Sequence, residues 1–130
     1  MYYAHSTNDE SRANWQLLPE HLIDTANRAG QFGQPLGVAR AARLAGLLHD
    51  LGKYTSEFLA RLCGAKERVD HSTAGAAVVL QLARTANADN RLVAELIAWH
   101  HAGLPDKQGE TFSTFSERHK SFSETELDSI

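Results

Sequence analysis

Residues 42–53 read ARLAGLLHDLGK, an apolar stretch that ends in the adjacent pair His49 and Asp50 and is followed closely by Lys53. Leucine and alanine recur along it at the spacing of one helix face. The stretch predicts a helix over 38–50, and we expect this helix to be the central and most buried one. An imidazole, a carboxylate and an ammonium therefore come together near the end of a core helix, which is typical of a metal site.

Four other segments have the same helical spacing of apolar residues. They predict helices over 19–29, from 55 or 56 to 62, over 70–82 and from 89 or 90 to 101. Alternating β-branched runs are absent, so we expect no strand, and residues 1–17 read as an extended leader whose aromatic side chains pack onto the domain. The fold class predicted is all-α, a bundle of about five core helices with irregular connections.

Glycine and proline mark the predicted helix ends. Gly52 is expected to stop the helix over 38–50, because glycine adopts a positive φ without a side-chain penalty. Four such residues predict a loop after the first helix: Gly30, Gly33, Pro35 and Gly37. The run Ala-Gly-Ala-Ala at 74–77 has small side chains and predicts a close approach between the helix over 70–82 and the helix over 38–50.

Length and composition favour one ordinary globular domain. The chain has 130 residues, of which 42% are hydrophobic and 22% charged. We expect a domain over 1–105 and a polar, loosely ordered tail over 106–130. No apolar run approaches the roughly 20 residues that span a bilayer, and the start lacks the pattern of a signal peptide, so a cytoplasmic location without a membrane is expected.

Charge and cysteine content narrow the function classes. The single cysteine cannot form an intrachain disulfide, so nothing points to an oxidising compartment. The net charge of −3 gives no global attraction to nucleic acid. A nucleic-acid substrate would therefore be held by metal, by local basic residues or by a partner.

Histidine placement is the strongest functional signal. Five of the seven histidines, with one aspartate, fall at the ends or inner faces of four predicted helices: His21, His49, Asp50, His71, His100 and His101. Imidazole and carboxylate are ligands for Mn, Fe, Co, Ni or Zn. Six candidates exceed what one ion needs, so they predict two metals with Asp50 as the bridge. Two such ions favour hydrolysis of a phosphate ester.

Simpler interpretations apply to single residues. Lys53 either neutralises charge on phosphoryl oxygens or is a solvated cation at a helix end, and its spacing does not separate these two roles. A lone His21 is more often a surface or core histidine than a ligand. His5 and His119 lie outside the predicted helical core, and we expect both to be unligated. The convergence of the whole set, rather than any one residue, indicates the metal site.

The order of these motifs resembles the HD superfamily of metal-dependent phosphohydrolases. Further stretches narrow the resemblance to the HD nuclease of type I CRISPR interference: Tyr3-Ala4-His5-Ser6, Trp15 followed by 18–22 (LPEHL), 44–54 (LAGLLHDLGKY), 70–76 (DHSTAGA) and 100–104 (HHAGL). The resemblance covers residues 2 to about 105. It implies an HD-domain helical bundle.

The resemblance also implies a ligand set and an activity. One metal would be bound by His21, His49 and Asp50, and the other by His71, His100 and His101 with Asp50 shared. Lys53 matches the family lysine beside the phosphate, and Asp50 and Lys53 are the expected catalytic residues. The implied reaction is cleavage of single-stranded DNA, with Mn, Fe, Co or Ni expected ahead of Zn or Mg.

The same resemblance implies partners and one departure. A superfamily 2 helicase, as a domain or subunit, and the CRISPR surveillance complex are the expected partners. A late aspartate usually completes the first metal's shell, and neither Asp106 nor Asp128 is well placed for this, so we expect an incomplete shell. The family domain is normally longer, and we expect the loss of its late helices to expose apolar faces of the bundle and favour a homodimer. The alternatives are a phosphohydrolase of nucleotides or small phosphomonoesters, and a weakly active metal-binding interaction module.

Overall fold

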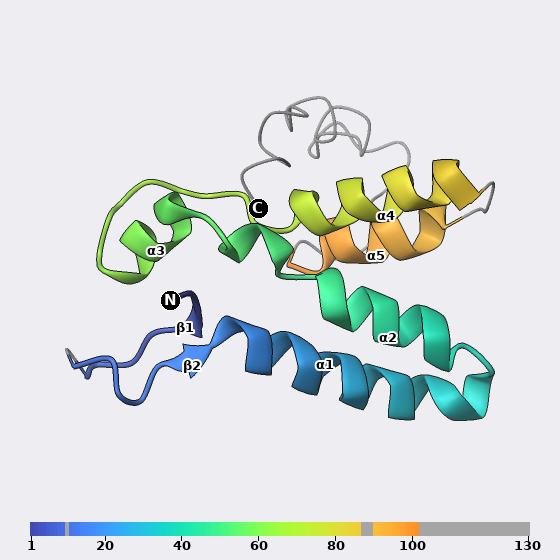
Figure 1. Cartoon of the computed structure of the whole chain (residues 1–130), viewed down its shortest axis with the longest axis horizontal. Coiled ribbons are helices and arrows are strands. Elements are labelled where there is room, and N and C mark those ends of the chain that lie inside the picture. Colours follow the sequence, from blue (N-terminus) through green and yellow to red (C-terminus); the bar gives the residue numbers. More distant parts are fainter. Residues whose placement is uncertain (10, 87–89, 102–130) are drawn as a thin grey trace.

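The computed structural model describes residues 1–9, 11–86 and 90–101. Five helices dominate this part of the chain, which confirms the all-α fold class (Figure 1). They are α1 (Leu18–Gly33), α2 (Ala39–Leu48), α3 (Ser56–Leu62), α4 (Thr73–Ala86) and α5 (Arg91–Trp99). No helix among the described residues is long and apolar enough to cross a bilayer.

Helices α1 and α2 form an antiparallel hairpin (Figure 1). Pro19 lies in the first turn of α1, where its missing N–H costs nothing, and Leu22 and Ala26 form the buried face. Gly46 of α2 packs directly on this face. A Cβ atom on Gly46 would lie 2.9 Å from Cα of Ala26, so a glycine lets the two helix backbones touch.

The first helix is longer than its sequence indicates. It continues to Gly33 instead of ending near residue 29, and a 3-10 turn over Gln34–Leu36 follows. The prediction of a loop from Gly30 was therefore wrong, because a Cβ on Gly33 would meet Cβ of Ala42 at 3.0 Å and packing against α2 favours the missing side chain. Gly37 makes the turn with a φ of 72°.

Helices α4 and α5 supply the larger core cluster. Its buried residues come from both helices: Ala76, Val79, Val93, Ala94, Ile97, Ala98 and Trp99. In α2 only Gly46 is buried, so the expectation that α2 is the most buried helix was wrong. The predicted close approach of α4 to α2 is confirmed at Gly75, where a Cβ would clash with the carbonyl of Leu48.

A short ribbon precedes α1 and corrects the expectation of no strand. Strand β1 (Tyr3–His5) pairs antiparallel with β2 (Gln16–Leu17). Pairing over two or three residues is too short to produce a periodic pattern in the sequence. The ribbon is held by the buried side chains of Ala4 and Leu18, and Tyr2 packs edge-to-face on Tyr54 as expected of the leader.

The connection from α2 to α3 carries the site. Helix α2 ends at Leu48 rather than residue 50, and a 3-10 turn, η2 (Leu51–Lys53), follows Asp50. Gly52 does not have a positive φ, which corrects its predicted role as a helix stop. Its backbone N–H donates to the carbonyl of His71, and a Cβ would lie 2.6 Å from that oxygen. Gly52 therefore lets η2 press against the start of α4.

Candidate metal centre

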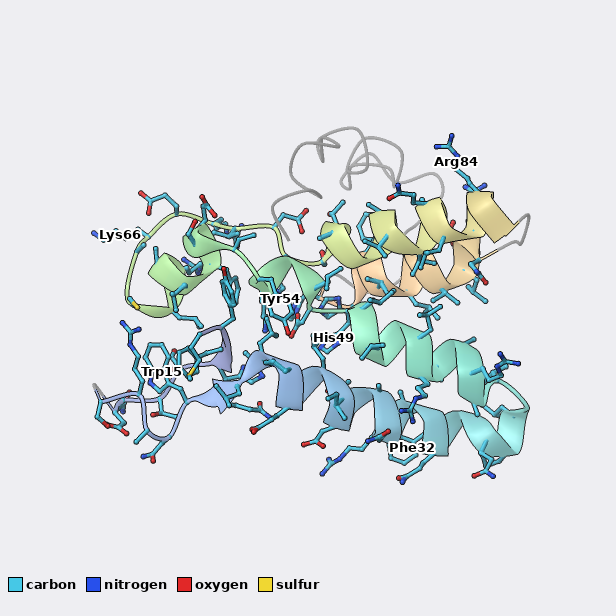
Figure 2. All side chains as sticks on the ribbon, in the orientation of Figure 1. Trp15, Phe32, His49, Tyr54, Lys66 and Arg84 are labelled. Carbon is cyan, nitrogen blue, oxygen red and sulfur yellow. The ribbon has the colours of Figure 1, made fainter. Side chains whose placement is uncertain are left out.

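The structure brings all six predicted site residues together from four parts of the chain. His21 lies on α1, and His49 and Asp50 follow α2. His71 lies just before α4, and the last two, His100 and His101, follow α5. Figure 2 shows His49 near the centre of the molecule, between α1 and the segment that carries Tyr54.

The Asp50 carboxylate is the centre of the cluster and is 2% exposed. Its Oδ2 atom lies 3.2 Å from Nε2 of His21 and 3.2 Å from Nε2 of His49. Its Oδ1 atom lies 3.5 Å from Nε2 of His100 and 3.6 Å from Nε2 of His71. Each carboxylate oxygen thus faces its own pair of imidazoles.

Two ligand groups follow from this geometry, and Asp50 belongs to both. One contains His21 and His49, and the other contains His71, His100 and His101. Within each group the ligand atoms all lie within 4.8 Å of one another. His100 and His101 are exposed, so the second group is open to solvent while the first is half-buried.

Backbone carbonyls fix the orientation of three of the imidazoles. Nδ1 donates to the carbonyl of Gly46 in His49 (2.8 Å), of Ile97 in His100 (2.7 Å) and of Val69 in His71 (3.3 Å). A carbonyl only accepts, so Nδ1 carries the proton in each ring. In the neutral form of each ring, Nε2 then carries the lone pair that a metal ligand requires, and this atom faces Asp50.

The start of α4 holds His71 in place. The Asp70 carboxylate accepts from the backbone N–H groups of Ser72 (3.0 Å) and Thr73 (3.3 Å), and it therefore caps the start of the helix. Its other oxygen accepts from the hydroxyl of Thr73 at 2.6 Å. This cap fixes the backbone on the C-terminal side of His71.

The electrostatics keep Asp50 ionised. Burial by itself raises the pKa of Asp50, but the side chains of His100, His49 and Lys53 that face the carboxylate outweigh it and hold the pKa well below its usual range. For His21 and His71, burial lowers the pKa below its ordinary value. For His49, burial lowers the pKa, but its hydrogen bond to Asp50 outweighs this and leaves it raised.

Lys53 is buried, which corrects the alternative of a solvated cation at a helix end. The residue is 5% exposed, and its Nζ lies 2.7 Å from Oδ2 of Asp50. Nζ also donates to the carbonyl of Ala4 at 3.1 Å and lies 5.1 Å from the centre of the Phe58 ring. Its positive charge is therefore directed at Asp50 and the first ligand group.

His5 is the residue near the site that sequence reasoning undervalued. Its ring centre lies 4.9 Å from that of His21, although it belongs to neither ligand group. The Tyr3-Ala4-His5-Ser6 motif contained the signal, but position outside the helical core argued against it. His119, Asp106 and Asp128 lie outside the described residues.

The residues present fit a metal site. Oδ1 of Asp50 is buried and has no hydrogen-bond partner among the described residues, which is costly unless another group satisfies it. Nε2 atoms also meet at short distances, 2.9 Å between His71 and His101 and 3.2 Å between His21 and His49. Converging imidazole nitrogens around an ionised carboxylate match the preferences of divalent metals.

A comparison with protein families agrees with this geometry. The family model described as HD domain matches residues 19–127. The chain belongs to the HD domain family. HD domains form a superfamily of metal-dependent phosphohydrolases that bind divalent metals, and the cluster around Asp50 is the metal-binding feature expected of one. No curated protein matches the chain at a significant level.

The HD match also extends past the expected domain boundary. It reaches residue 127, and thus includes most of the segment 106–130 that we expected to be a polar tail. The division at residue 105 stays a prediction, because residues 102–130 lie outside the described part of the chain.

Proposed function

We propose that this HD domain is a two-metal phosphodiesterase that cleaves single-stranded DNA in CRISPR interference. The observation that carries the proposal is the position of Asp50, whose two oxygens face separate groups of histidines. One carboxylate shared by two ligand groups is the arrangement that a bridged pair of ions requires. The HD family membership supports the phosphohydrolase chemistry.

The proposed ligand assignment follows the two groups. The first ion takes His21, His49 and Asp50, and the second takes His71, His100 and His101 with Asp50 shared. Mn, Fe, Co or Ni is proposed ahead of Zn on the motif resemblance, and Mg is placed behind because imidazole ligands suit transition metals better. The late aspartate that completes the family's first shell is not among the described residues of either group.

The protein side of the reaction rests on orientation and charge. Two bound divalent ions would supply an activated water and would stabilise the attacking and leaving oxygens of the phosphodiester. Asp50 fixes the spacing of the two sites, and the carbonyls of Gly46, Val69 and Ile97 hold the imidazole planes. The exposed His100 and His101 mark the side from which substrate approaches.

Lys53 acts on the reaction through Asp50 in this proposal. Because its Nζ bonds Oδ2 of Asp50 and is nearly inaccessible, it adds positive charge behind the first ligand group. That charge lowers the cost of bringing the anionic phosphate to the site. We therefore favour a role in which Lys53 positions the Asp50 carboxylate over one in which Lys53 contacts the substrate directly.

Single-stranded DNA as substrate and the choice of partners rest on the motif resemblance. The net charge of −3 gives the chain no general affinity for DNA, so a superfamily 2 helicase and the surveillance complex are proposed to deliver the strand. A cytoplasmic location belongs to the same proposal. Exposed apolar side chains lie on α5, at the end of α1 and in the turn after it, and are available to such a partner or to a second copy of the chain: Leu92, Leu96, Phe32 and Leu36.

A nuclease assay tests the proposal. Purified protein is incubated with Mn²⁺, Ni²⁺ or Fe²⁺ and circular single-stranded DNA, beside an Asp50→Ala variant and the control Asp24→Ala, which removes an exposed carboxylate from α1. We expect metal-dependent cleavage that Asp50→Ala abolishes and Asp24→Ala preserves. Equal cleavage by Asp50→Ala would reject the proposal.

The same assay separates the two alternatives. A panel of nucleotides and small phosphomonoesters is offered to the metal-loaded protein, and turnover faster than that of DNA would make the chain a small-molecule phosphohydrolase. Absence of turnover on either class, together with substoichiometric metal, would instead indicate a metal-binding interaction module.

A further inference from the structure

The N-terminal strand β1 reaches the metal centre at two points. The ring of His5 lies edge-to-face on His21, with centres 4.9 Å apart and planes at 86°. The carbonyl of Ala4 accepts a hydrogen bond from Lys53, whose Nζ bonds Asp50 in turn. Both contacts lead to the group of His21, His49 and Asp50, and not to the group at the ends of α4 and α5.

His21 lacks the support that its neighbours in the site have. Nδ1 of His49, His71 and His100 each donates to a backbone carbonyl. In the described part of the chain, no carbonyl accepts from Nδ1 of His21. Its ring instead packs between His5 and His49, whose centres lie 4.9 Å and 5.2 Å away.

The irregular pairing of β1 explains how His5 arrives there. Tyr3 pairs with Leu17 and His5 with Gln16, so two steps along β1 match one step along β2. Such a bulge changes the direction of a side chain, and bulges occur often beside active sites. Ala4, which is 1% exposed, anchors the strand between the two paired residues.

We propose that His5 is a positioning residue for His21. The His5 ring fixes the plane of the His21 imidazole, so that Nε2 of His21 points toward the ion shared with His49 and Asp50. His5 orients His21 as backbone carbonyls orient His49, His71 and His100, and it acts on the first metal site alone. This inference rests on the proposed two-metal centre and not on the DNA substrate.

Calorimetric titration of the metal-free protein with Mn²⁺ tests the role of His5 without any substrate, and Co²⁺ absorption reports the ligand field. In His5→Ala we expect about a tenfold weaker first site, which is the low end for loss of a residue that orients a ligand. The second site should be unchanged. His5→Phe keeps an aromatic ring against His21 and should restore most of the affinity and the Co²⁺ spectrum.

The control variant is Tyr2→Ala, which removes another aromatic contact of the same strand region, the one to Tyr54. It should leave both metal affinities unchanged. Wild-type affinity at both sites in His5→Ala would overturn the inference. Failure of His5→Phe combined with rescue by His5→Gln would also overturn it, because His5 would then act through a polar atom and not through ring packing.

The outcome is separable from that of the nuclease proposal. Normal metal binding by the wild-type protein without DNA cleavage counts against the nuclease alone. Two normal metal affinities in His5→Ala, in a protein that cleaves DNA, count against the positioning role alone.

Discussion

The Nζ atom of Lys53 lies 2.7 Å from Oδ2 of Asp50, and both side chains are almost completely buried. Breaking a buried pair by removing one partner leaves an uncompensated charge and costs about 3 kcal/mol or more. We therefore expect Lys53→Met to lower the free energy of unfolding of the metal-free protein by about 3 kcal/mol. Urea unfolding measures this loss.

Bound metal should reverse part of the Lys53→Met defect. A divalent ion supplies positive charge to the same carboxylate, and ligands that bind only the folded state stabilise it. We expect Mn²⁺ to raise the stability of Lys53→Met more than that of the wild type. The control, Lys66→Met, removes an exposed lysine and should change neither value. Equal stabilisation of all three proteins by Mn²⁺ would contradict the pairing of Lys53 with Asp50.

The contact between α1 and α2 predicts opposite effects for two glycines. A Cβ on Gly46 would press on the backbone of Ala26 at 2.9 Å, so Gly46→Ala should cost about 1–3 kcal/mol through overpacking. A Cβ on Gly30 would meet its nearest atoms at 3.6 Å, an ordinary contact, so Gly30→Ala should be neutral or stabilise α1 by about 0.5–1 kcal/mol. Thermal unfolding of both variants checks this, and a tolerated Gly46→Ala would refute the packing.

The Asp70 cap links helix stability to the metal centre. Asp70→Ala leaves the N–H groups of Ser72 and Thr73 without their side-chain acceptor and should cost about 1 kcal/mol. Because His71 precedes the capped turn, the affinity of the second metal site should fall as well. Asp70→Asn keeps one acceptor oxygen and should retain most of both properties. Calorimetry with Mn²⁺ measures the affinity of the second site. If Asp70→Ala lost stability but kept the wild-type affinity, the cap would not support the metal site.

The number of protons released on metal binding should fall as pH rises. Burial lowers the pKa of His21, His71 and His101, so these imidazoles are neutral at pH 7 and release no proton when they bind metal. The raised pKa of His49 means that this imidazole still carries a proton just above pH 6.5. Proton release from His49 should therefore fall as pH rises through the His49 pKa, and the total release should increase below pH 6.5 as the other imidazoles become charged.

Calorimetry in buffers of different ionisation enthalpy measures this release. A variant with His49→Asn should lose the component near neutral pH while keeping the acidic one. A release that stays constant from acidic to alkaline pH would show that the protonation of His49 is not coupled to the metal.

The sequence predicted the fold class and the helices because each helix carries an apolar face with its own period. Helix ends were harder to predict. Gly30 and Gly33 read as a break, yet both lie inside α1, because contacts with α2 outweigh the local preference of glycine. The burial of α2 was overestimated because Leu44, Ala45 and Leu48 pack against the core that α4 and α5 enclose but are only partly buried there.

The six site residues were predictable because each adjoins an apolar helix, and helices of a compact bundle must meet. The position of His5 was not predictable, because its approach to His21 depends on a bulge in the short pairing of β1 with β2. The partners that orient the imidazoles are backbone carbonyls, such as that of Gly46, and these have no signature in the side-chain pattern. The burial of Lys53 also required the fold, because it depends on Ala4 from the other end of the domain.

The proposed two-metal centre requires the Asp50 carboxylate to bridge two metal ions. Anomalous diffraction at the manganese edge, from crystals grown with Mn²⁺, tests it most directly. We expect two anomalous peaks roughly 3.5–4 Å apart, one beside His21 and His49 and the other beside His71, His100 and His101, with a carboxylate oxygen of Asp50 toward each. A single peak, or two peaks that Asp50 does not join, would contradict it.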